Sequence, residues 1–338
     1  MSKVVRESRD DREERGSQCR RRKSLLPYRC LVDRNVVNQE EVVMVQNALF
    51  NLRRMAIVLA AALLALAVRG SALAQTYTSI DYPDGVNTQA FGVNDRGDIV
   101  GRWDDADGNV HGFLDRQGTF TSIDVPGATF TAPRFINNRG DIAGRYEVDK
   151  GISQGFTLEH GIYTSINYPD AVDTRVRSID DHGRITGNFR RADDVEHGFL
   201  LDRNGFHQID FPAAETTDLW QINDAGRMVG DYTDPDTFLV RGYKLVRGTF
   251  TSIDYPGAHD TSARSIDPIG RIVGVWTDDS INSHGFLLER NSFESIDFPD
   301  ASSTSAFTIN AQGLIVGNFI DADGNGHGFV RDPPHHDR

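Results

Sequence analysis

Short apolar runs alternate with clusters of Gly, Asn, Asp and Pro from Tyr77 to the end of the chain. Near the end, the runs Ala306–Ile309, Leu314–Phe319 and His327–Val330 follow the similar run Phe293–Asp297. Runs of this length between turn-forming residues predict β-strands, and no segment of this region keeps a helical period. The sequence therefore predicts an all-β domain.

The strand pattern repeats every 43 or 44 residues. Isoleucine marks the same point of each unit, at Ile80, Ile123, Ile166, Ile209, Ile253 and Ile296. A fixed period of this length with four short strands per unit is typical of β-propeller blades. The six units predict a six-bladed β-propeller with four strands per blade over residues 75–332. The chain enters on the outermost strand type and ends with three strands of the last unit, so we expect the N-terminal strand to close the last blade.

Two glycines recur in every unit, first at Gly97 and Gly101. Gly97 follows an Asn or Asp that opens a tight hairpin, and the left-handed backbone needed there favours glycine. Gly101 falls inside a predicted strand, where glycine indicates a close backbone approach. We attribute that approach to crowding of the blades near the propeller axis. Two recurring aromatic positions, represented by Trp103 and Phe113, are predicted to pack between sheets, with ligand contact as the alternative.

The repeat unit also resembles a known sequence family. Its pattern Ile-Asn-x-x-Gly-x-Ile-Val-Gly, followed by His-Gly-Phe, is similar to the HAF-type repeats of bacterial extracellular proteins. The resemblance covers Tyr77 to about Asp332, and the histidine stands at His111, His197, His284 and His327. Gln154 and Arg241 replace it in the other two units. The resemblance implies secretion and a repeat domain, and it implies no established activity.

Residues 44–74 are predicted to be a signal peptide. Arg53 and Arg54 precede an apolar run from Met55 to Val68, and Ala72-Leu73-Ala74 offers a small-residue cleavage site. The run is shorter than a bilayer span requires. We expect a secreted or periplasmic protein with no membrane span after cleavage. A membrane anchor is the alternative, and the arginine pair also admits a twin-arginine signal.

The two ends of the chain are predicted to lie outside the folded domain. Residues 1–43 mix both charges densely without apolar periodicity, which indicates a disordered extension or a wrongly assigned start, with translation beginning at Met44 or Met55. Residues 333–338 are predicted to be a disordered tail. Weak metal binding by His335 and His336 is the alternative for that segment.

Removing residues 1–74 changes the charge balance. They hold 14 of the 36 basic and 8 of the 49 acidic residues, which leaves 22 basic and 41 acidic residues and a formal charge of −19. This balance argues against nucleic-acid binding. Both cysteines, Cys19 and Cys30, lie in the removed part, so the domain has no disulfide, and its core must supply its stability.

We expect the domain to be a monomer.

One position of the repeat departs from the apolar pattern. Three residues before the hairpin turn, the six units carry Phe91, Arg134, Arg177, Trp220, Arg264 and Phe307. Guanidinium and aromatic groups near a propeller axis are suited to a carboxylate-bearing sugar, through bidentate pairing and stacking. Ion pairing of the three arginines with aspartates around the ring is the alternative, and it is the interpretation the sequence favours.

Two acidic loops precede His-Gly-Phe and carry candidate calcium ligands at Asp105, Asp107, Asn109, Asp321, Asp323 and Asn325. Alternating oxygen ligands with a glycine bend suit calcium. Neither loop has the full twelve-residue pattern with its closing glutamate, and Asp and Gly also form ordinary hairpin turns. The alternative is therefore a domain without a cofactor.

These features predict a function class rather than a reaction. The repeated histidines occupy equivalent positions, which indicates a structural hydrogen bond in each blade rather than a catalytic group needed once. The main prediction is a binding or scaffolding module for a carbohydrate or an extracellular protein, without enzymatic activity. The alternative is an extracellular polysaccharide-active hydrolase or lyase. An enzyme should show one buried cluster with shifted pKa values that breaks the repeat pattern.

Overall fold

The computed structural model describes residues 75–333. The chain divides into two units, Met1–Gly70 and Ser71–Arg338, and every described residue belongs to the second. The predicted extension and signal peptide, and residues 334–338 of the predicted tail, therefore lie outside the described residues. Within residues 75–333 all helical and strand structure consists of 24 β-strands, which confirms the all-β prediction. No helix in this range is long and apolar enough to cross a membrane.

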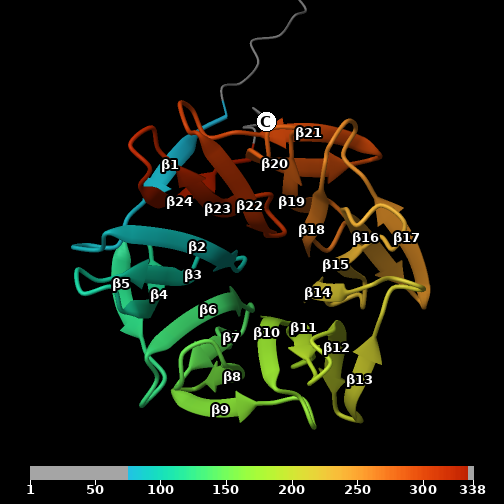
Figure 1. Cartoon of the computed structure of the whole chain (residues 1–338). Helices are drawn as coiled ribbons and strands as arrows, with labels where there is room; N and C mark the ends of the chain where they lie inside the picture. Colours follow the sequence, from blue (N-terminus) through green and yellow to red (C-terminus); the bar gives the residue numbers. More distant parts are fainter. Residues whose placement is uncertain (1–74, 334–338) are drawn as a thin grey trace, which may run out of the picture. The chain divides into compact units, whose positions relative to one another are not determined.

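The strands form sheets arranged in a ring about a central axis, and the first strand of each repeat lies innermost (Figure 1). Three four-stranded sheets follow the chain order. They contain β10 (Asp173–Ile179), β11 (Ile185–Arg190), β12 (Glu196–Asp202) and β13 (Gly205–Ile209); β14 (Thr217–Ile222), β15 (Met228–Thr233), β16 (Val240–Val246) and β17 (Thr249–Ile253); and β18 (Thr261–Ile266), β19 (Ile272–Thr277), β20 (Ser283–Glu289) and β21 (Ser292–Ile296).

A fourth four-stranded sheet contains β22 (Ser303–Ile309), β23 (Ile315–Ile320), β24 (Gly326–Arg331) and β1 (Tyr77–Ile80). The remaining strands form one eight-stranded sheet. It contains β2 (Asn87–Val93), β3 (Ile99–Asp104), β4 (Val110–Arg116), β5 (Thr119–Ile123), β6 (Phe130–Ile136), β7 (Ile142–Glu147), β8 (Ser153–Glu159) and β9 (Ile162–Ile166).

This hydrogen bonding corrects the prediction of six separate four-stranded blades. The fold is a β-propeller, but only four of its sheets are separate four-stranded blades. The first two repeats join into one sheet because Val110 of β4 pairs in parallel with Phe130 of β6. This single residue pair connects the two repeats into one sheet. The repeat pattern of the sequence does not predict such a pair.

The N-terminal strand closes the ring as the phase of the repeats predicts. Strand β1 pairs antiparallel with β24, from Tyr77 opposite Arg331 to Ile80 opposite Gly328. The Asp332 amide adds a hydrogen bond to the Thr76 carbonyl at 3.0 Å. Without β1, strand β24 would present an unpaired edge.

The core lies between neighbouring sheets. Its largest fully buried side chains include one aromatic from the third strand of each repeat, at Phe113, Phe156, Phe199, Tyr243, Phe286 and Phe329. Phe113 clusters with Ile80 of β1 and Val316 of β23, which belong to the adjacent sheet. The predicted packing role of this aromatic position is confirmed.

The recurring glycines have two different explanations. Gly97 and its equivalents adopt positive φ angles, with φ +81° at Gly97, as the predicted hairpin turn requires. Gly101 is needed for a reason other than crowding at the axis. A Cβ at Gly101 would lie 1.9 Å from the Gln89 carbonyl oxygen and 2.7 Å from the Phe113 ring, both within its own sheet. The register shift between Ala90 and Gly92 accompanies this approach.

Hydrogen bonds connect the hairpin turns of successive repeats into a belt. The Asn94 Nδ2 donates to the Asn137 carbonyl at 3.3 Å, and the Asn137 Nδ2 donates to the Asp180 carbonyl at 3.1 Å. Asn223 and Asn310 make the same contact with the turns that follow them. We call this end of the propeller the turn face. Because the strands alternate in direction, the loops before each innermost strand and each His-Gly-Phe segment lie together at the opposite end, the loop face.

Candidate functional site

The structure brings all six predicted ring residues together. Phe91, Arg134, Arg177, Trp220, Arg264 and Phe307 lie on the innermost strands and line one narrow space of about 20 Å³. The Arg134 guanidinium lies 3.9 Å from the Phe91 ring centroid. Arg177 and Arg264 lie 4.0 Å and 3.5 Å from the Trp220 ring. These cation–π contacts fill the middle of the channel, so this level is too narrow for a sugar.

The sequence analysis favoured ion pairs between the three ring arginines and aspartates, and the structure does not show such pairs within residues 75–333. Within residues 75–333, no carboxylate lies within 4.0 Å of Arg134, Arg177 or Arg264. The Arg177 Nε donates to the Asn188 Oδ1 at 2.9 Å. The Nε atoms of Arg134 and Arg264 are buried without a hydrogen-bond partner among the described residues. Burial lowers the pKa of Arg134 well below its usual value, and the neighbouring Arg177 lowers it further.

Above this level, on the loop face, the channel widens into a cavity of about 260 Å³. Arg134 forms part of its wall together with the aromatic rings of Phe91 and Phe307. Gln89, Ser303, Ser305 and Asn318 add polar side chains, and Phe319, Ile320 and Gly326 complete the lining. The Asn318 Oδ1 is buried and has no partner within residues 75–333. The cavity thus combines an unpaired cation, two aromatic rings, hydroxyl groups and amides, which are the groups that bind acidic sugars.

A second cluster on neighbouring strands contains three carboxyl groups that the sequence analysis did not single out. Asp218 of β14 and Asp231 of β15 are direct cross-strand partners. Asp231 is 7% exposed, and its Oδ2 accepts hydrogen bonds from the Trp220 Nε1 at 2.7 Å and from the Ser262 hydroxyl. The Asp218 Oδ1 is buried without a hydrogen-bond partner in the described part of the chain. Like charges directly opposite each other destabilise a sheet.

The third carboxyl group is Glu196 of β12. Its Oε1 accepts hydrogen bonds from the Asn188 amide and, at 3.0 Å, from the Arg175 Nη1. Burial raises the pKa of Glu196 to about 7, and the negative charge of Asp218 adds to this effect. Burial likewise raises the pKa of Asp231 to about 6, again with a contribution from Asp218. The cluster therefore holds protons at a pH where ordinary carboxyl groups have lost them.

Comparison of the repeats reveals why this cluster is singular. At the position of Asp218 the units carry Gln89, Ala132, Arg175, Asp218, Ser262 and Ser305. At the position of Asp231 they carry Arg102, Arg145, Asn188, Asp231, Val275 and Asn318. At the position of Glu196 they carry Val110, Ser153, Glu196, Val240, Ser283 and Gly326. Each carboxyl group thus occurs once at its position, and the fold gathers all three in two neighbouring sheets.

In the two predicted calcium loops, the first aspartate accepts hydrogen bonds from other residues of the same loop. In the first loop, the Asp105 Oδ1 accepts the backbone amides of Asp107 and Asn109 at 2.9 Å and 2.8 Å. Its Oδ2 accepts the Asn109 side-chain amide at 2.8 Å and contacts the His111 Nε2 at 3.3 Å. The Asn109 amides hold the pKa of Asp105 down at about 2, with a smaller contribution from His111.

The second loop repeats this arrangement, with Asp321 bonded to the backbone amides of Asp323 and Asn325 and to His327. The Asn325 amides lower the pKa of Asp321. Both loops are hairpins closed by an aspartate, which is the structural alternative given above. Calcium binding by these residues stays a prediction.

The repeated histidines make the hydrogen bonds expected of structural residues. The His111 Nδ1 lies 3.0 Å from the Asp124 Oδ1, and the equivalent distances are 3.2 Å for His197, 2.7 Å for His284 and 2.6 Å for His327. Each ring also stacks on the aromatic residue of the strand before it, as His111 does on Trp103 at 4.8 Å. At His327 the partner is Asp81, directly after β1, so this contact also ties the N-terminal strand to the last sheet.

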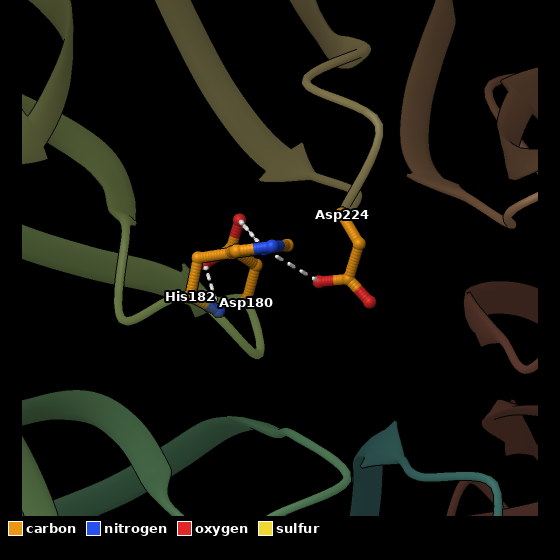
Figure 2. A group of neighbouring side chains, drawn as sticks. All are labelled: Asp180, His182 and Asp224. Atoms are coloured by element: carbon orange, nitrogen blue, oxygen red, sulfur yellow. Dashed lines mark hydrogen bonds and ion pairs between the residues drawn. The ribbon is translucent and has the colours of Figure 1, made fainter.

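A group on the turn face contains Asp180, His182 and Asp224 (Figure 2). The His182 Nδ1 lies 3.7 Å from the Asp180 Oδ2 and 3.6 Å from the Asp224 Oδ1. However, the Arg184 guanidinium already pairs with the Asp180 Oδ2 at 2.5 Å. A metal ion would have to displace this guanidinium, so the group does not form a free set of ligands.

Comparison with known proteins supports the fold of this domain but assigns it no function. No protein-family model and no curated protein match the chain, so the HAF resemblance stays a prediction. Among solved structures, TolB from Acinetobacter baumannii is similar with a TM-score of 0.50 and 10% identity, over 75% of this chain and 65% of that one.

Two further structures align with lower scores. AofleA from Arthrobotrys oligospora aligns with a TM-score of 0.46 and 11% identity over 76% of this chain and 83% of that one. The β-propeller domain of the Trilobed protease from Pyrococcus furiosus aligns with a TM-score of 0.47 and 11% identity over 75% of this chain and 86% of that one. At these identities the function has to be argued from the residues of this chain.

Proposed function

We propose that this propeller is a binding module for a carboxylate-bearing sugar, held at the loop-face mouth of its channel. The observation that supports the proposal is Arg134, a guanidinium without an ion-pair partner in residues 75–333 that lines the 260 Å³ cavity. A buried cation without a counter-charge is costly for the fold. A ligand carboxylate would supply the missing charge, and it can accept two parallel hydrogen bonds from the guanidinium.

The rest of the cavity matches the remainder of a sugar ring. Phe307 offers apolar surface for its C–H groups, while Ser303, Ser305 and Gln89 offer partners for its hydroxyl groups. The strongly negative charge of the domain would repel an acidic polymer at long range, but a local cationic wall can still select its carboxylate. The place of action is proposed to be outside the cytoplasm, because the leader predicts export.

Isothermal titration with tri-galacturonic acid, and with the neutral galactose trimer as comparison, tests this proposal. We expect measurable binding of the acid only. Arg134→Gln should weaken it at least about tenfold, since a charged hydrogen bond contributes roughly 1.5–3 kcal/mol. Arg134→Lys keeps the charge and should retain part of the affinity.

Arg116→Gln is the matched control, because the Arg116 side chain is 62% exposed and lies at the turn-face end of β4. Equal affinity of the native domain for the acidic and neutral trimers would overturn the proposal. Unchanged affinity of a folded Arg134→Gln variant would do the same. Shortening of the trimer during the titration would instead favour the enzyme alternative.

A further inference from the structure

We propose that a cavity on the loop face, between the second and third repeats, binds a neutral 6-deoxyhexose, a sugar with a methyl group at C6. The cavity has a volume of about 350 Å³. Small-molecule sites measure roughly 300–1,000 Å³. Its wall comes from the segment before β8, from β8 itself, from the loop after β9 and from the start of β10. It shares no lining residue with the 260 Å³ cavity beside Arg134, so either proposal can fail without the other.

The first argument is a pair of side chains that is closed in the other repeats and open here. Four repeats pair the histidine of His-Gly-Phe with an aspartate at 2.6–3.2 Å. The fourth repeat pairs Arg241 with Asp254 at 3.5 Å. The second repeat carries Gln154 and Asn167 at these two positions. Within residues 75–333 no hydrogen bond joins these two side chains, although both line the cavity.

The second argument is that both amides offer unused hydrogen-bonding groups to the cavity. The Gln154 Oε1 accepts the Tyr146 hydroxyl at 2.9 Å, and its Nε2 has no acceptor among the described residues. The Asn167 Nδ2 donates to the Ser165 hydroxyl at 3.1 Å, and its Oδ1 has no donor in the same part of the chain. Asn167 is exposed and the Gln154 Nε2 is not sealed from solvent, so a ligand can reach both groups. Because a hydroxyl group both donates and accepts, two neighbouring sugar hydroxyls match this donor and this acceptor.

The third argument is that the cavity presents no free charge. Asp173 is the charged residue of its lining, but the Asp173 side chain is only 2% exposed, and its Oδ1 lies 2.9 Å from the Arg175 Nε. Its Oδ2 accepts the Ser153 amide at 3.1 Å. The charged residues of the two adjoining loops lie outside the lining and are Asp149, Lys150 and Asp170. A charged ligand would lose water here without gaining a counter-charge, which favours a neutral one.

The fourth argument is the aliphatic part of the lining. Ile152 and Val172 are 51% and 49% exposed, and Ala171 precedes Val172 in the same loop. Among the described residues no aromatic ring lines the cavity. Branched aliphatic side chains suit the methyl group of a 6-deoxyhexose. The hydroxymethyl group of other hexoses would place its hydroxyl against these side chains without a partner, which costs free energy.

Ligand-observed NMR titration of the protein with L-rhamnose and L-fucose tests this site. L-mannose and L-galactose, which carry a hydroxyl at C6, are the matched comparisons. We expect at least one 6-deoxyhexose to bind at least about fivefold more tightly than its counterpart, because the methyl group is buried without an unpaired hydroxyl. The galactose trimer used above carries hydroxyls at C6 and therefore remains a valid neutral comparison.

The double variant Gln154→His and Asn167→Asp installs the pair found in four other repeats, so it should keep the fold. It should weaken binding of the 6-deoxyhexose at least about tenfold, because the free donor and acceptor are replaced by a closed pair. Binding of the acidic trimer should stay unchanged. Gln312→His, exposed on the turn face, is the control and should affect neither ligand.

Ile152→Asn tests the aliphatic wall, and asparagine already stands at this position in three repeats, at Asn109, Asn282 and Asn325. It should remove most of the preference for the 6-deoxyhexose over its counterpart. Circular dichroism melting shows whether each variant is folded. The proposal would be overturned if neither 6-deoxyhexose binds, or if each binds no better than its counterpart. Unchanged affinity and preference in both folded variants would place the sugar elsewhere and overturn it as well.

Discussion

The side-chain amide of Asn310 donates a 3.0 Å hydrogen bond to the main-chain carbonyl of Asn94, which lies 216 residues earlier in the chain. This bond joins the last hairpin turn to the first and completes the belt on the turn face. Both asparagines are buried, and the Asn310 Oδ1 also accepts the amides of Gln312 and Leu314 within its own turn. A single side chain therefore shapes its own turn and also links the last turn to the first.

Replacing Asn310 with alanine should lower the stability of the whole domain. The change removes the side-chain acceptor of the Gln312 and Leu314 amides and one of the two donors to the Asn94 carbonyl, at a cost of about 1–3 kcal/mol for each group left without a partner. For a domain of this size each kcal/mol corresponds to roughly 2–4 °C in melting temperature. Gln312→Ala, on the exposed side of the same turn, is the control. A melting temperature of Asn310→Ala equal to that of the control would show that the belt does not contribute.

Removing residues 75–81 should uncover the edge of β24. The lost contacts include the β1–β24 ladder, the 2.7 Å bond from the Gln75 Nε2 to the Glu294 Oε1 and the packing of Tyr77 on Phe298. We expect a lower melting temperature and concentration-dependent association, because unpaired strand edges template pairing with other chains. Size-exclusion chromatography with light scattering measures this. A truncated domain that stays monomeric and melts unchanged would contradict the closing role of β1.

Asp231→Asn should stabilise the domain at alkaline pH. The folded-state pKa of Asp231 is raised to about 6, above its unfolded value, so its protonation favours folding and this stability is lost as the pH rises through about 6. At pH 8 the amide removes the repulsion from Asp218 and can still accept from Trp220. We expect a gain of about 1–3 kcal/mol in the free energy of unfolding.

The gain should vanish near pH 4, where Asp231 is protonated in the folded protein. Urea denaturation at pH 4 and pH 8 measures both values, and Asp236→Asn, in the exposed loop between β15 and β16, serves as control. A loss of stability at pH 8 would mean that the Asp231 charge is neutralised by the arginines around it.

The double variant His111→Gln and His327→Gln should lose more stability at acidic than at alkaline pH. Burial alone would lower the pKa of each histidine, but hydrogen bonds to Asp124 and Asp105, and to Asp81 and Asp321, raise it overall. This stabilisation is fully present below the usual histidine pKa and is lost as the pH rises through the raised folded value. Glutamine is suitable because Gln154 fills the same position in the second repeat.

Melting curves at pH 5.5 and pH 8.5 measure the difference, with the exposed His160→Gln as control, since Gln117 stands at the equivalent position of the first repeat. An equal loss at both values would show that charge does not contribute to these contacts. The result would then assign the histidines a packing role on Trp103 and Phe319.

The sequence predicts the strands and their order well, because each repeat contains its own turn signals and the same apolar positions. The merging of the first two repeats into one sheet could not be predicted, since it rests on a single residue pair, Val110–Phe130, between two neighbouring repeats. The arginine ring was found by comparing repeats at one position. Its pairing was wrongly interpreted, because composition does not show which carboxylates come within reach.

The carboxyl cluster was missed for a related reason. Asp218 and Asp231 stand 13 residues apart, and they become neighbours only through the register of the β14–β15 hairpin, which includes a shift between Leu219 and Gln221. Glu196 comes from a different repeat. Comparing the repeats at every inward-facing position, rather than at one, would have shown that each of these three carboxyl groups is unique.

The pairing of β1 with β24 has a consequence for how the domain is made. Tyr77–Ile80 is the first strand of the propeller to be synthesised, and its partner is the last, so the ladder cannot form until synthesis reaches Arg331. Contacts of such long sequence separation form late and slow folding. Until then β1 remains a single short strand, with only Ile80 of its four residues buried in the final fold. A strand of four residues with one buried side chain offers little apolar surface to other chains while it is unpaired.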